Sequence, residues 1–479
     1  MPDTADAPSH EAPVASVPQL DDTLLRRMDQ PGPRYTSYPT ADRFIDAFTA
    51  EHHRQALRQR GSGLIGGASD GGPLSVYVHV PFCESICYYC ACNKIVTRDH
   101  SRGDAYVQAL ATELDLVCRD LGTGLPVSQL HFGGGTPTFL SDAQLTALMD
   151  HLRRHLVITP GSECSIEIDP RTVDRTRLLH LKALGFNRLS FGVQDFDPAV
   201  QQAVHRVQPQ EQVVALMAEA RAIGFESINV DLIYGLPRQT AASFARTVRE
   251  VAVLRPDRVA MYGYAHLPQR FKPQRRIAIE ELPSGTDRIG MLSQALSGFV
   301  GHGYQYIGMD HFALPEDSLA QAKRQGRLHR NFQGYSTQAD CDLIALGVSA
   351  IGRIGATYSQ NAKTMDEYVD ALGRGELPVV RGLALTRDDL LRRSVIMSIM
   401  CHGRLSYESV ALAHLVDVKA YFATELAELD ALTEAGLLTH DADGLELTAL
   451  GWYFVRTVAM VFDRHLRADQ QRERFSRVV

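Results

Sequence analysis

The sequence predicts an α/β protein in which six strand–helix units form a parallel sheet, followed by a smaller, mainly helical module. Two observations support this class. Short β-rich runs alternate with helical stretches, as they do in strand–helix–strand units, and this alternation gives way to a different texture after about Asp388. The 479 residues leave room for a large core with one or two appended modules. Six units suit either an open, doubly wound sheet or a partial barrel, and the pattern alone does not separate them.

The expected strands are short and rich in β-branched or aromatic residues, and they lie at Ser75–Val80, Ser128–Phe132, Cys164–Ile168, Arg188–Val193, Ser227–Ile233 and Arg258–Tyr264. The helices expected between them lie at Tyr106–Leu121, Ala143–Leu156, Thr172–Leu184, Gln210–Ile223 and Ala241–Leu254. Ser141-Asp142 and Asp197-Pro198 are capping sequences that indicate where two of the helices begin.

The pattern in the last part of the chain predicts three helices, at Asp388–Cys401, Tyr407–Leu415 and Val418–Ala435. A hairpin with its turn at Asp441–Gly444 follows them. This order is typical of a winged-helix-like module, and winged helices often bind DNA. The helix that would enter the major groove, however, carries Glu425, Glu428 and Asp430. Acidic side chains do not favour a nucleic-acid groove, so we expect a structural cap.

Composition excludes several classes of protein. The net charge is −7, from 49 basic and 56 acidic residues, so a general nucleic-acid binder is not expected. No apolar run approaches the roughly 20 residues that span a bilayer, so no membrane association is expected. The first 20 residues have neither the basic start nor the apolar stretch of a secretory signal. We therefore expect a cytoplasmic protein.

We expect five parts along the chain. A flexible tail that is rich in Pro and Ala spans residues 1–20, and an extension that borders the active site spans 21–73. The catalytic core spans 74–310, and a segment that completes the active site spans 311–387. A helical domain spans 388–479.

Half of the eight cysteines are clustered. Cys83, Cys87, Cys90 and Cys92 fall within ten residues and follow the first predicted strand. Structural zinc sites usually combine two distant cysteine pairs, whereas iron–sulfur clusters take thiolates from tighter runs. Three ligands on a four-iron cluster would leave one iron open to a small molecule. Cys92 is close enough to be a fourth ligand but would strain the loop.

Polar or small residues also lie at the carboxyl ends of four predicted strands, namely Glu167, Gln194, Asp231 and Ala265. In parallel α/β proteins, ligands bind beyond these ends. Gly133-Gly134-Gly135 follows the second strand. Three glycines could form only a tight turn, or they could let the backbone approach a ligand closely.

The C-x3-C-x2-C loop after a first strand resembles the radical S-adenosylmethionine (SAM) superfamily, which implies a partial (β/α)6 barrel. Other segments resemble, within that superfamily, the oxygen-independent coproporphyrinogen III oxidases: Gly32–Thr40, Cys92–Arg98, His131–Thr138, Asn187–Ser190, Gly192–Phe196, Asp231–Pro237, Tyr264–Pro268, Gly308–Phe312, His329–Tyr335 and Phe475–Val479. The resemblance extends over nearly everything from Gly32 to Val479.

The resemblance implies a [4Fe-4S] cluster held by Cys83, Cys87 and Cys90, with SAM on its open iron. Cys92 matches a cysteine that is characteristic of the family without being a ligand. Tyr77, Gly134 and Glu167 would line the cluster-bound SAM. A second SAM would contact Tyr89, Gly135, Thr136, Gln194, Arg206, Asp231, Ala265 and Ile351. The family often has Phe in place of Tyr89, whose ring can still stack.

The implied reaction removes hydrogen, carbon dioxide and an electron from two propionates of coproporphyrinogen III, leaving vinyl groups. A 5′-deoxyadenosyl radical from SAM takes the hydrogen. Such an anionic substrate requires local cations, and we expect Arg34, Arg275 and Arg276 to supply them, because arginine pairs with carboxylates bidentately. The basic run that holds the last two could instead be a solvated loop. The sequence does not identify the electron donor, and we expect a flavodoxin or ferredoxin. The resemblance implies a monomer.

Two other functions are weighed against this one. Radical SAM relatives that traffic haem share the three-cysteine loop but typically lack the C-x-C extension and the Gly32–Thr40 segment, both of which are present here. The second alternative is a zinc-stabilised binding protein that recognises its ligand through the winged module. The acidic helix and the polar strand ends both disfavour it.

Overall fold

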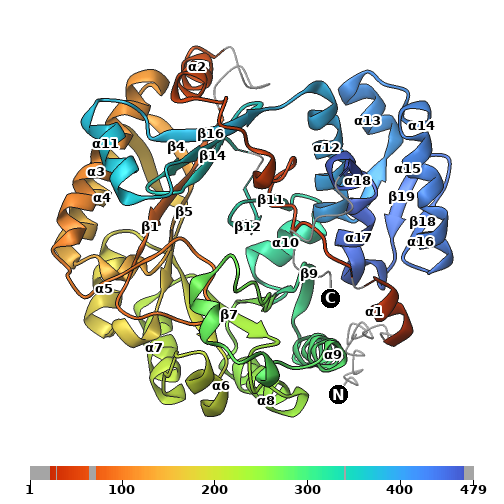
Figure 1. Cartoon of the computed structure of the whole chain (residues 1–479), viewed down its shortest axis with the longest axis horizontal. Coiled ribbons are helices and arrows are strands. Elements are labelled where there is room, and N and C mark those ends of the chain that lie inside the picture. The colour runs from red at the N-terminus through yellow and green to blue at the C-terminus, as the bar shows by residue number, and fades with distance from the viewer. Residues whose placement is uncertain (1–21, 29, 64–71, 339–340, 469–479) are drawn as a thin grey trace, which may run out of the picture.

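The structure is a computed structural model that describes residues 22–28, 30–63, 72–338 and 341–468. The expected tail at 1–20 and the family-like ending at 475–479 lie outside these residues. A twelve-stranded sheet and the helices around it form the larger part of the molecule. The C-terminal residues form a smaller unit beside it, drawn in blue at the right of Figure 1.

Six parallel strands stand in chain order at the centre of the sheet: β1 (Leu74–Val80), β4 (Leu125–Gly134), β5 (Leu156–Ile168), β6 (Arg188–Gln194), β7 (Ser227–Tyr234) and β8 (Arg258–Gly263). The helices that connect them lie on the outside in Figure 1: α3 (Arg102–Leu121), α4 (Asp142–His155), α5 (Arg175–Ala183), α7 (Gln210–Ile223) and α8 (Ala241–Leu254). The structure confirms the predicted α/β class.

The expected helix starts are built by side-chain caps. Before α4, the Ser141 hydroxyl accepts a hydrogen bond from the Gln144 backbone N–H at 3.2 Å, and the Gln144 side chain accepts one from the Ser141 N–H at 2.9 Å. Before α6 (Pro198–Ala203), Asp197 accepts from the Ala199 N–H at 2.9 Å. These caps satisfy N–H groups that have no partner within the helix.

Short strands extend the parallel sheet at both ends, and the sequence pattern did not reveal them. On the β1 side lie β13 (Leu343–Leu346), β14 (Ile351–Ile354), β15 (Thr357–Asn361) and β16 (Val379–Ala384). Beyond β8 lie β10 (His311–Ala313) and β9 (Gln305–Gly308). Runs of three to six residues are too short to establish a period. The segment expected as a connection therefore contributes to the sheet.

The two faces of the central strands differ in polarity. In β6, Leu189, Phe191 and Val193 are buried, whereas the alternate residues Ser190 and Gln194 are half-buried. β5 and β7 alternate in the same way. The buried residues belong to the core that includes the apolar faces of the surrounding helices. The polar residues therefore face the side away from those helices, which we call the inner face.

The C-terminal unit contains α12 (Arg387–His402) and α13 (Tyr407–His414), and its three-stranded antiparallel sheet is β17 (Arg404–Ser406), β19 (Gly444–Leu447) and β18 (Leu438–His440). The single helix expected at Val418–Ala435 is wrong. The chain instead forms α14 (Val418–Tyr421), α15 (Ala423–Glu428) and α16 (Asp430–Glu434). The breaks fall at Phe422 and Leu429, whose side chains are completely buried, so core packing overrides helix propensity here.

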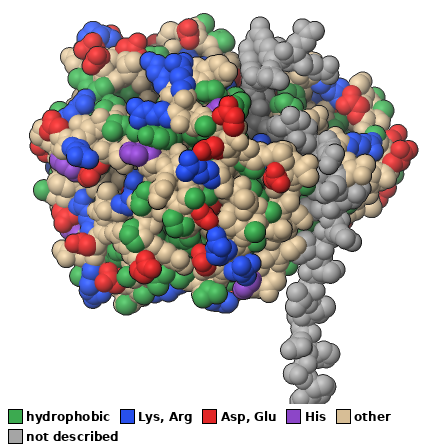
Figure 2. Space-filling view, turned by 60° about the horizontal axis from the view of Figure 1, so that its bottom comes forward, with side chains coloured by type: hydrophobic (Ala, Val, Ile, Leu, Met, Phe, Trp, Pro, Cys, Tyr) green, Lys and Arg blue, Asp and Glu red, His purple; other side chains and the backbone are tan. Residues whose placement is uncertain are grey.

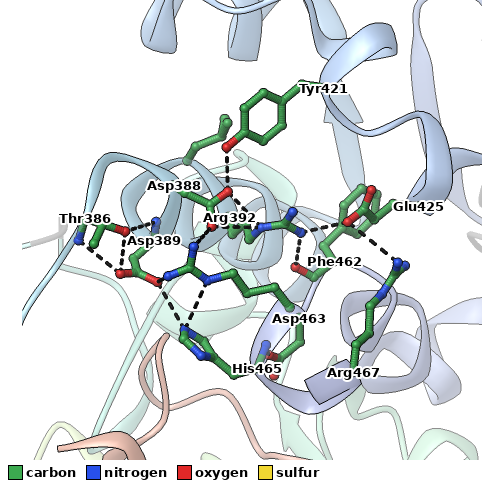
Figure 3. A network of polar contacts seen from close by, with 12 residues as sticks. Thr386, Asp388, Asp389, Arg392, Tyr421, Glu425, Phe462, Asp463, His465 and Arg467 are labelled. Carbon is green, nitrogen blue, oxygen red and sulfur yellow. Dashed lines mark hydrogen bonds and ion pairs between the residues drawn. The ribbon is translucent and has the colours of Figure 1, made fainter. Parts of the chain in front are cut away.

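A polar network holds the start of α12 against the end of the described chain (Figure 3). Asp388 pairs with Arg392 at 3.0 Å, and Arg392 continues to Glu425 at 2.9 Å. Asp389 pairs with Arg464 at 3.0 Å and lies 3.1 Å from His465 Nε2. Because most of these groups are poorly accessible to solvent, their charges need these partners.

The same C-terminal segment contacts the beginning of the chain. The Tyr35 hydroxyl donates to Asp463 at 3.0 Å, and Arg43 donates to the His465 carbonyl at 3.0 Å. Residues more than 400 positions apart in sequence are thus held together. On the C-terminal side, Asp463 lies between α17 (Val455–Met460) and α18 (Arg464–Ala468), and His465 lies on α18.

The surface carries charges of both signs. On the face shown in Figure 2, Lys and Arg side chains are interspersed with Asp and Glu. None of the described helices combines the length and the apolar character that crossing a bilayer requires.

Asp389 provides a pH test of this architecture. Burial opposes its ionisation, but hydrogen bonds from His465 and Thr386 outweigh burial and hold its pKa at about 2. A pKa lowered from 3.8 contributes about 2 kcal/mol to folding when the group is ionised. Asp389→Asn should lower the unfolding free energy by about this amount at pH 7, and its difference from the wild type should shrink as pH falls from about 4 to about 2.

Unfolding followed by circular dichroism across this pH range checks the prediction. The exposed Asp430 offers the control variant Asp430→Asn, which should track the wild type. A difference between Asp389→Asn and the wild type that stays constant across the range would contradict the role of the ionised carboxylate.

Candidate active site

The four clustered cysteines lie on one loop whose two ends are fastened together. β2 (Phe82–Cys83) pairs in parallel with β3 (Ile95–Val96). The Ile95 N–H donates to the Pro81 carbonyl at 2.7 Å, and the Thr97 N–H donates to the Cys83 carbonyl at 2.9 Å. The loop therefore leaves and returns at one place, and all four of its thiols line a single pocket.

Cations and a hydroxyl surround the thiols. Arg206 Nη1 lies 3.6 Å from Cys87 Sγ, and Arg171 Nη2 lies 4.0 Å from the same sulfur. Both guanidiniums also contact Asp169, at 3.3 and 2.6 Å. The Thr136 hydroxyl donates to Cys83 Sγ at 3.6 Å. Nearby positive charge favours the thiolate, which is the form that binds metals.

The individual thiols differ in acidity. A hydrogen bond from Cys92 lowers the pKa of Cys90 to about 6, and Lys94 acts in the same direction. Burial raises the pKa of Cys83 to about 11. Cys92 is the exposed member of the four and is engaged with Cys90. Three thiols on a C-x3-C-x2-C loop that share one pocket, with cations beside them, fit an iron–sulfur cluster.

Most of the residues expected to bind the cofactor meet at this pocket. They come from the cysteine loop, from the carboxyl ends of β4, β5 and β6, from the middle of β7 and from the segment after α6, and they are Tyr89, Gly134, Gly135, Thr136, Glu167, Gln194, Arg206 and Asp231. Of the four residues expected from the strand ends, Glu167, Gln194 and Asp231 line this pocket together, because neighbouring parallel strands end at the same edge of a sheet.

The glycines after β4 are required by close packing. A Cβ atom on Gly134 would lie 2.6 Å from the His79 ring, and Gly134 has a φ of +119°. A Cβ atom on Gly135 would lie 2.7 Å from the Pro81 carbonyl oxygen. The Gly134 N–H donates to Glu167 at 3.1 Å. The glycines therefore form a tight turn and also expose backbone to the pocket.

Two carboxylates make the floor of the pocket acidic. Asp231 accepts hydrogen bonds from Ser190 and Asn229, both at 2.9 Å. Burial and, after it, the negative charge of Glu167 raise the pKa of Asp231 to about 6. Such a floor suits a ligand that carries positive charge and hydroxyl groups, as the sulfonium, ammonium and ribose groups of SAM do.

Three of the expected cofactor residues are not among the described residues that line the pocket. Tyr77 lies on β1, with its hydroxyl 3.0 Å from His79 and its ring stacked on His131. Ala265 is linked to the cysteine loop, because the Gln274 amide donates both to its carbonyl at 3.2 Å and to that of Tyr89 at 3.0 Å. The third, Ile351, pairs with Gln360 in the sheet.

The three candidate arginines for the substrate occupy different surroundings. Arg275 and Arg276 are exposed on a short helical turn, where Arg275 donates to the Pro268 carbonyl and Arg276 lies 5.2 Å from the centre of the Tyr88 ring. Arg34 is half-buried. Its guanidinium lies 5.2 Å from the centre of the Tyr262 ring on the inner face of β8.

The structure adds residues that the sequence pattern did not single out. Asp169 and Arg171 line the pocket directly after β5, and Lys94 and Ser190 line it as well. Asp169 and Arg171 stand beyond the same strand end as Glu167, so the strand-end rule could have found both. Nothing in the sequence indicated that Arg171 would join Arg206 beside Cys87.

Comparisons with known proteins agree with this geometry. The family model described as "Radical SAM superfamily" matches residues 77–251, and that described as "HemN C-terminal domain" matches residues 385–454. The oxygen-independent coproporphyrinogen III oxidase of Pseudomonas aeruginosa is 48% identical, and the alignment covers 96% of this chain and 98% of the relative. The Escherichia coli protein of the same name is 46% identical over 97% of this chain and 100% of its own.

A solved structure agrees as well. The coproporphyrinogen III oxidase of Escherichia coli, described as a radical SAM enzyme, superposes with a TM-score of 0.87 at 45% identity. The match covers 94% of this chain and 99% of the other. The radical SAM core and the C-terminal domain therefore occur together in both proteins.

Substitution of two cysteines tests the ligand assignment. Cys83→Ala should lose most of the iron and sulfide bound by the wild type, because one of three cluster ligands is removed. Cys92→Ser should retain both, because the Cys92 thiol donates a hydrogen bond to Cys90 and does not serve as a ligand. Iron and sulfide analysis of protein purified without oxygen checks this. Loss of the cluster in Cys92→Ser would overturn the assignment.

Proposed function

The chain belongs to the family of oxygen-independent coproporphyrinogen III oxidases, and on that premise we propose that it oxidatively decarboxylates coproporphyrinogen III. Two propionate side chains become vinyl groups, which gives protoporphyrinogen IX in anaerobic haem biosynthesis. The enzyme is an oxidoreductase of the radical SAM superfamily and uses a [4Fe-4S] cluster and SAM. The convergence of three loop thiols with polar strand ends in one pocket is the observation that carries the proposal.

The cysteine loop holds the cluster through Cys83, Cys87 and Cys90. When bound, the reduced cluster would give one electron to SAM, and the carbon radical formed from SAM would remove hydrogen from the substrate. Arg206 and Arg171 stabilise the negative charge of the bound thiolates, since both lie within 4.0 Å of Cys87 Sγ. Such fixed charges are the means by which a protein tunes a cofactor.

The strand ends hold SAM. Glu167 accepts hydrogen bonds from hydroxyl groups, and the backbone of Gly134 approaches the ligand closely because that residue has no side chain. Tyr77 supports this wall of the site through its contacts with His79 and His131. The acidic floor favours a cationic ligand over a neutral one.

A second SAM is part of the proposal. Six of the residues assigned to it line the same pocket: Tyr89, Gly135, Thr136, Gln194, Arg206 and Asp231. Ala265 is held near Tyr89 by Gln274. Ile351 is assigned by the family resemblance alone.

The five-part organisation of the chain, with boundaries at 20, 73, 310 and 387, is also proposed. The ranges matched by the two family models lie within the third part and largely within the fifth. We propose a monomer that acts in the cytoplasm, where reducing conditions keep clustered thiols available for iron. A flavodoxin or ferredoxin is the proposed electron donor.

Turnover tests the proposed function. Protein purified without oxygen, given reductant, SAM and coproporphyrinogen III, should release methionine, carbon dioxide and a divinyl product. The matched control is Cys83→Ala, which should release none of them. Haem retention without turnover would indicate a trafficking protein, and bound zinc without sulfide would indicate a structural metal site. Either result would contradict the proposal.

A further inference from the structure

The inner face continues beyond the cofactor pocket along a row of aromatic side chains. Tyr262 on β8 meets His311 on β10 edge to face at 5.9 Å, and His311 meets Tyr335 in the same manner at 5.6 Å. Tyr262 retains 37% of its surface exposed. The row ends at Arg330, whose guanidinium lies 4.6 Å from the centre of the Tyr335 ring.

Arg330 is almost completely buried, with 5% of its surface exposed. It lies on β11 (His329–Asn331), which forms a hairpin with β12 (Gly334–Ser336). Its Nε and Nη2 atoms both donate to the backbone carbonyl of Arg34, at 3.2 and 3.1 Å. Its Nη1 atom is buried and has no hydrogen-bond partner among the described residues.

Arg34 brings a second guanidinium to the same place. Its Nη2 atom is likewise buried with no hydrogen-bond partner in the described part of the chain. Arg456, 3% exposed on α17, adds a third positive charge. Burial lowers the pKa of Arg456 to about 10, and the charge of Arg34 contributes to that shift. Asp310 is a carboxylate that interacts with all three arginines.

Asp310 is one carboxylate against three guanidinium groups, so the cluster has fewer negative charges than positive ones. A buried donor that lacks an acceptor also carries the full free-energy cost of its desolvation, and neighbouring buried cations repel one another. A carboxylate would relieve both effects, because guanidinium groups bind carboxylates with two hydrogen bonds in a fixed geometry. The Arg34 and Arg330 donors come from segments 296 residues apart, so the fold itself brings them together.

We propose that Arg34 and Arg330 form a carboxylate-binding site that holds the propionates that the product retains. This inference rests on the proposed function. The reacting propionate must lie at the cysteine pocket, and neither arginine is among the described residues that line it. The retained propionates need cations elsewhere. The aromatic row begins at Tyr262, which interacts electrostatically with Asp231 and Glu167 of that pocket, and it ends at Arg330. The exposed Arg275 and Arg276 lack such an enclosure.

Porphyrin affinity tests the site without turnover. Coproporphyrin III carries four propionates, and mesoporphyrin IX carries only the two that correspond to those kept in the product. Fluorescence titration of each porphyrin into the cluster-loaded, SAM-bound enzyme gives its affinity. Arg330→Gln and Arg34→Gln should each lower the affinity for both porphyrins about tenfold. Arg374→Gln, which removes an exposed arginine paired with Glu376 on the surface, should leave both affinities within about twofold.

Further measurements separate binding from folding. Iron content and SAM cleavage without substrate should match the wild type in both glutamine variants, and KM for coproporphyrinogen III should rise more than kcat falls. Arg330→Lys should retain more affinity than Arg330→Gln, since it keeps the charge. If Arg330→Gln loses its cluster, Arg34→Gln decides the question alone.

Unchanged affinity for both porphyrins in these variants would overturn the carboxylate site. A lower affinity for coproporphyrin III alone would also overturn it, because the arginines would then bind the reacting propionates. Failure of the wild type to convert coproporphyrinogen III would instead refute the proposed function. These outcomes are distinguishable because affinity is measured with porphyrins that are not turned over.

Discussion

Each parallel strand of the sheet has two faces, and in β5, β6 and β7 only one of them is apolar. Every other feature of the site depends on this two-residue alternation. The apolar face is covered by the surrounding helices, and the polar residues between the apolar ones must then share the inner face. A one-residue shift in any strand would exchange the two sets. Glu167, Ser190 and Asp231 are side by side because their strands keep this register.

The cysteine loop and the arginines take opposite parts of the inner face. The loop is fastened by the β2–β3 pairing over an acidic floor, whereas Arg34 and Arg330 meet at the end of the aromatic row. Segments remote in sequence fix the arginine side: the Tyr35 hydroxyl bonds Asp463, and the Tyr358 hydroxyl donates to the Tyr38 carbonyl at 3.3 Å. The acidic part suits a cationic cofactor, and the basic part suits an anionic substrate. The substrate is therefore oriented with its retained propionates at the arginines and its reacting propionate toward the cysteine pocket.

Local patterns in the sequence predicted the local features well. The alternation of β-rich and helical runs gave the six central strands, and the strand-end rule gave Glu167, Gln194 and Asp231. The three-cysteine spacing indicated a cluster because all ligands come from one loop. Features that depend on tertiary packing were not predictable in this way. The breaks at Phe422 and Leu429 follow from burial, and the short outer strands have too few residues to show a period.

The arginine pair illustrates the same limit. Arg34 was expected to bind substrate because an anionic substrate needs local cations and arginine pairs with carboxylates, but its partner Arg330 is 296 residues away, and no periodicity connects them. The expectation for Arg275 and Arg276 rested on a local basic run, and both proved to be exposed. Charge runs indicate where cations occur along the chain, whereas burial and unsatisfied donors indicate where an anion is needed.

The most direct test of the division of the inner face is a crystal structure of the cluster-loaded protein with SAM and coproporphyrin III. Two propionates should lie within hydrogen-bonding distance, about 3 Å, of Arg330 Nη1 and Arg34 Nη2. A third should point toward the pocket that Glu167 and Asp231 line. A porphyrin bound at Arg275 and Arg276 on the surface, with the Arg34 and Arg330 donors untouched, would contradict the account.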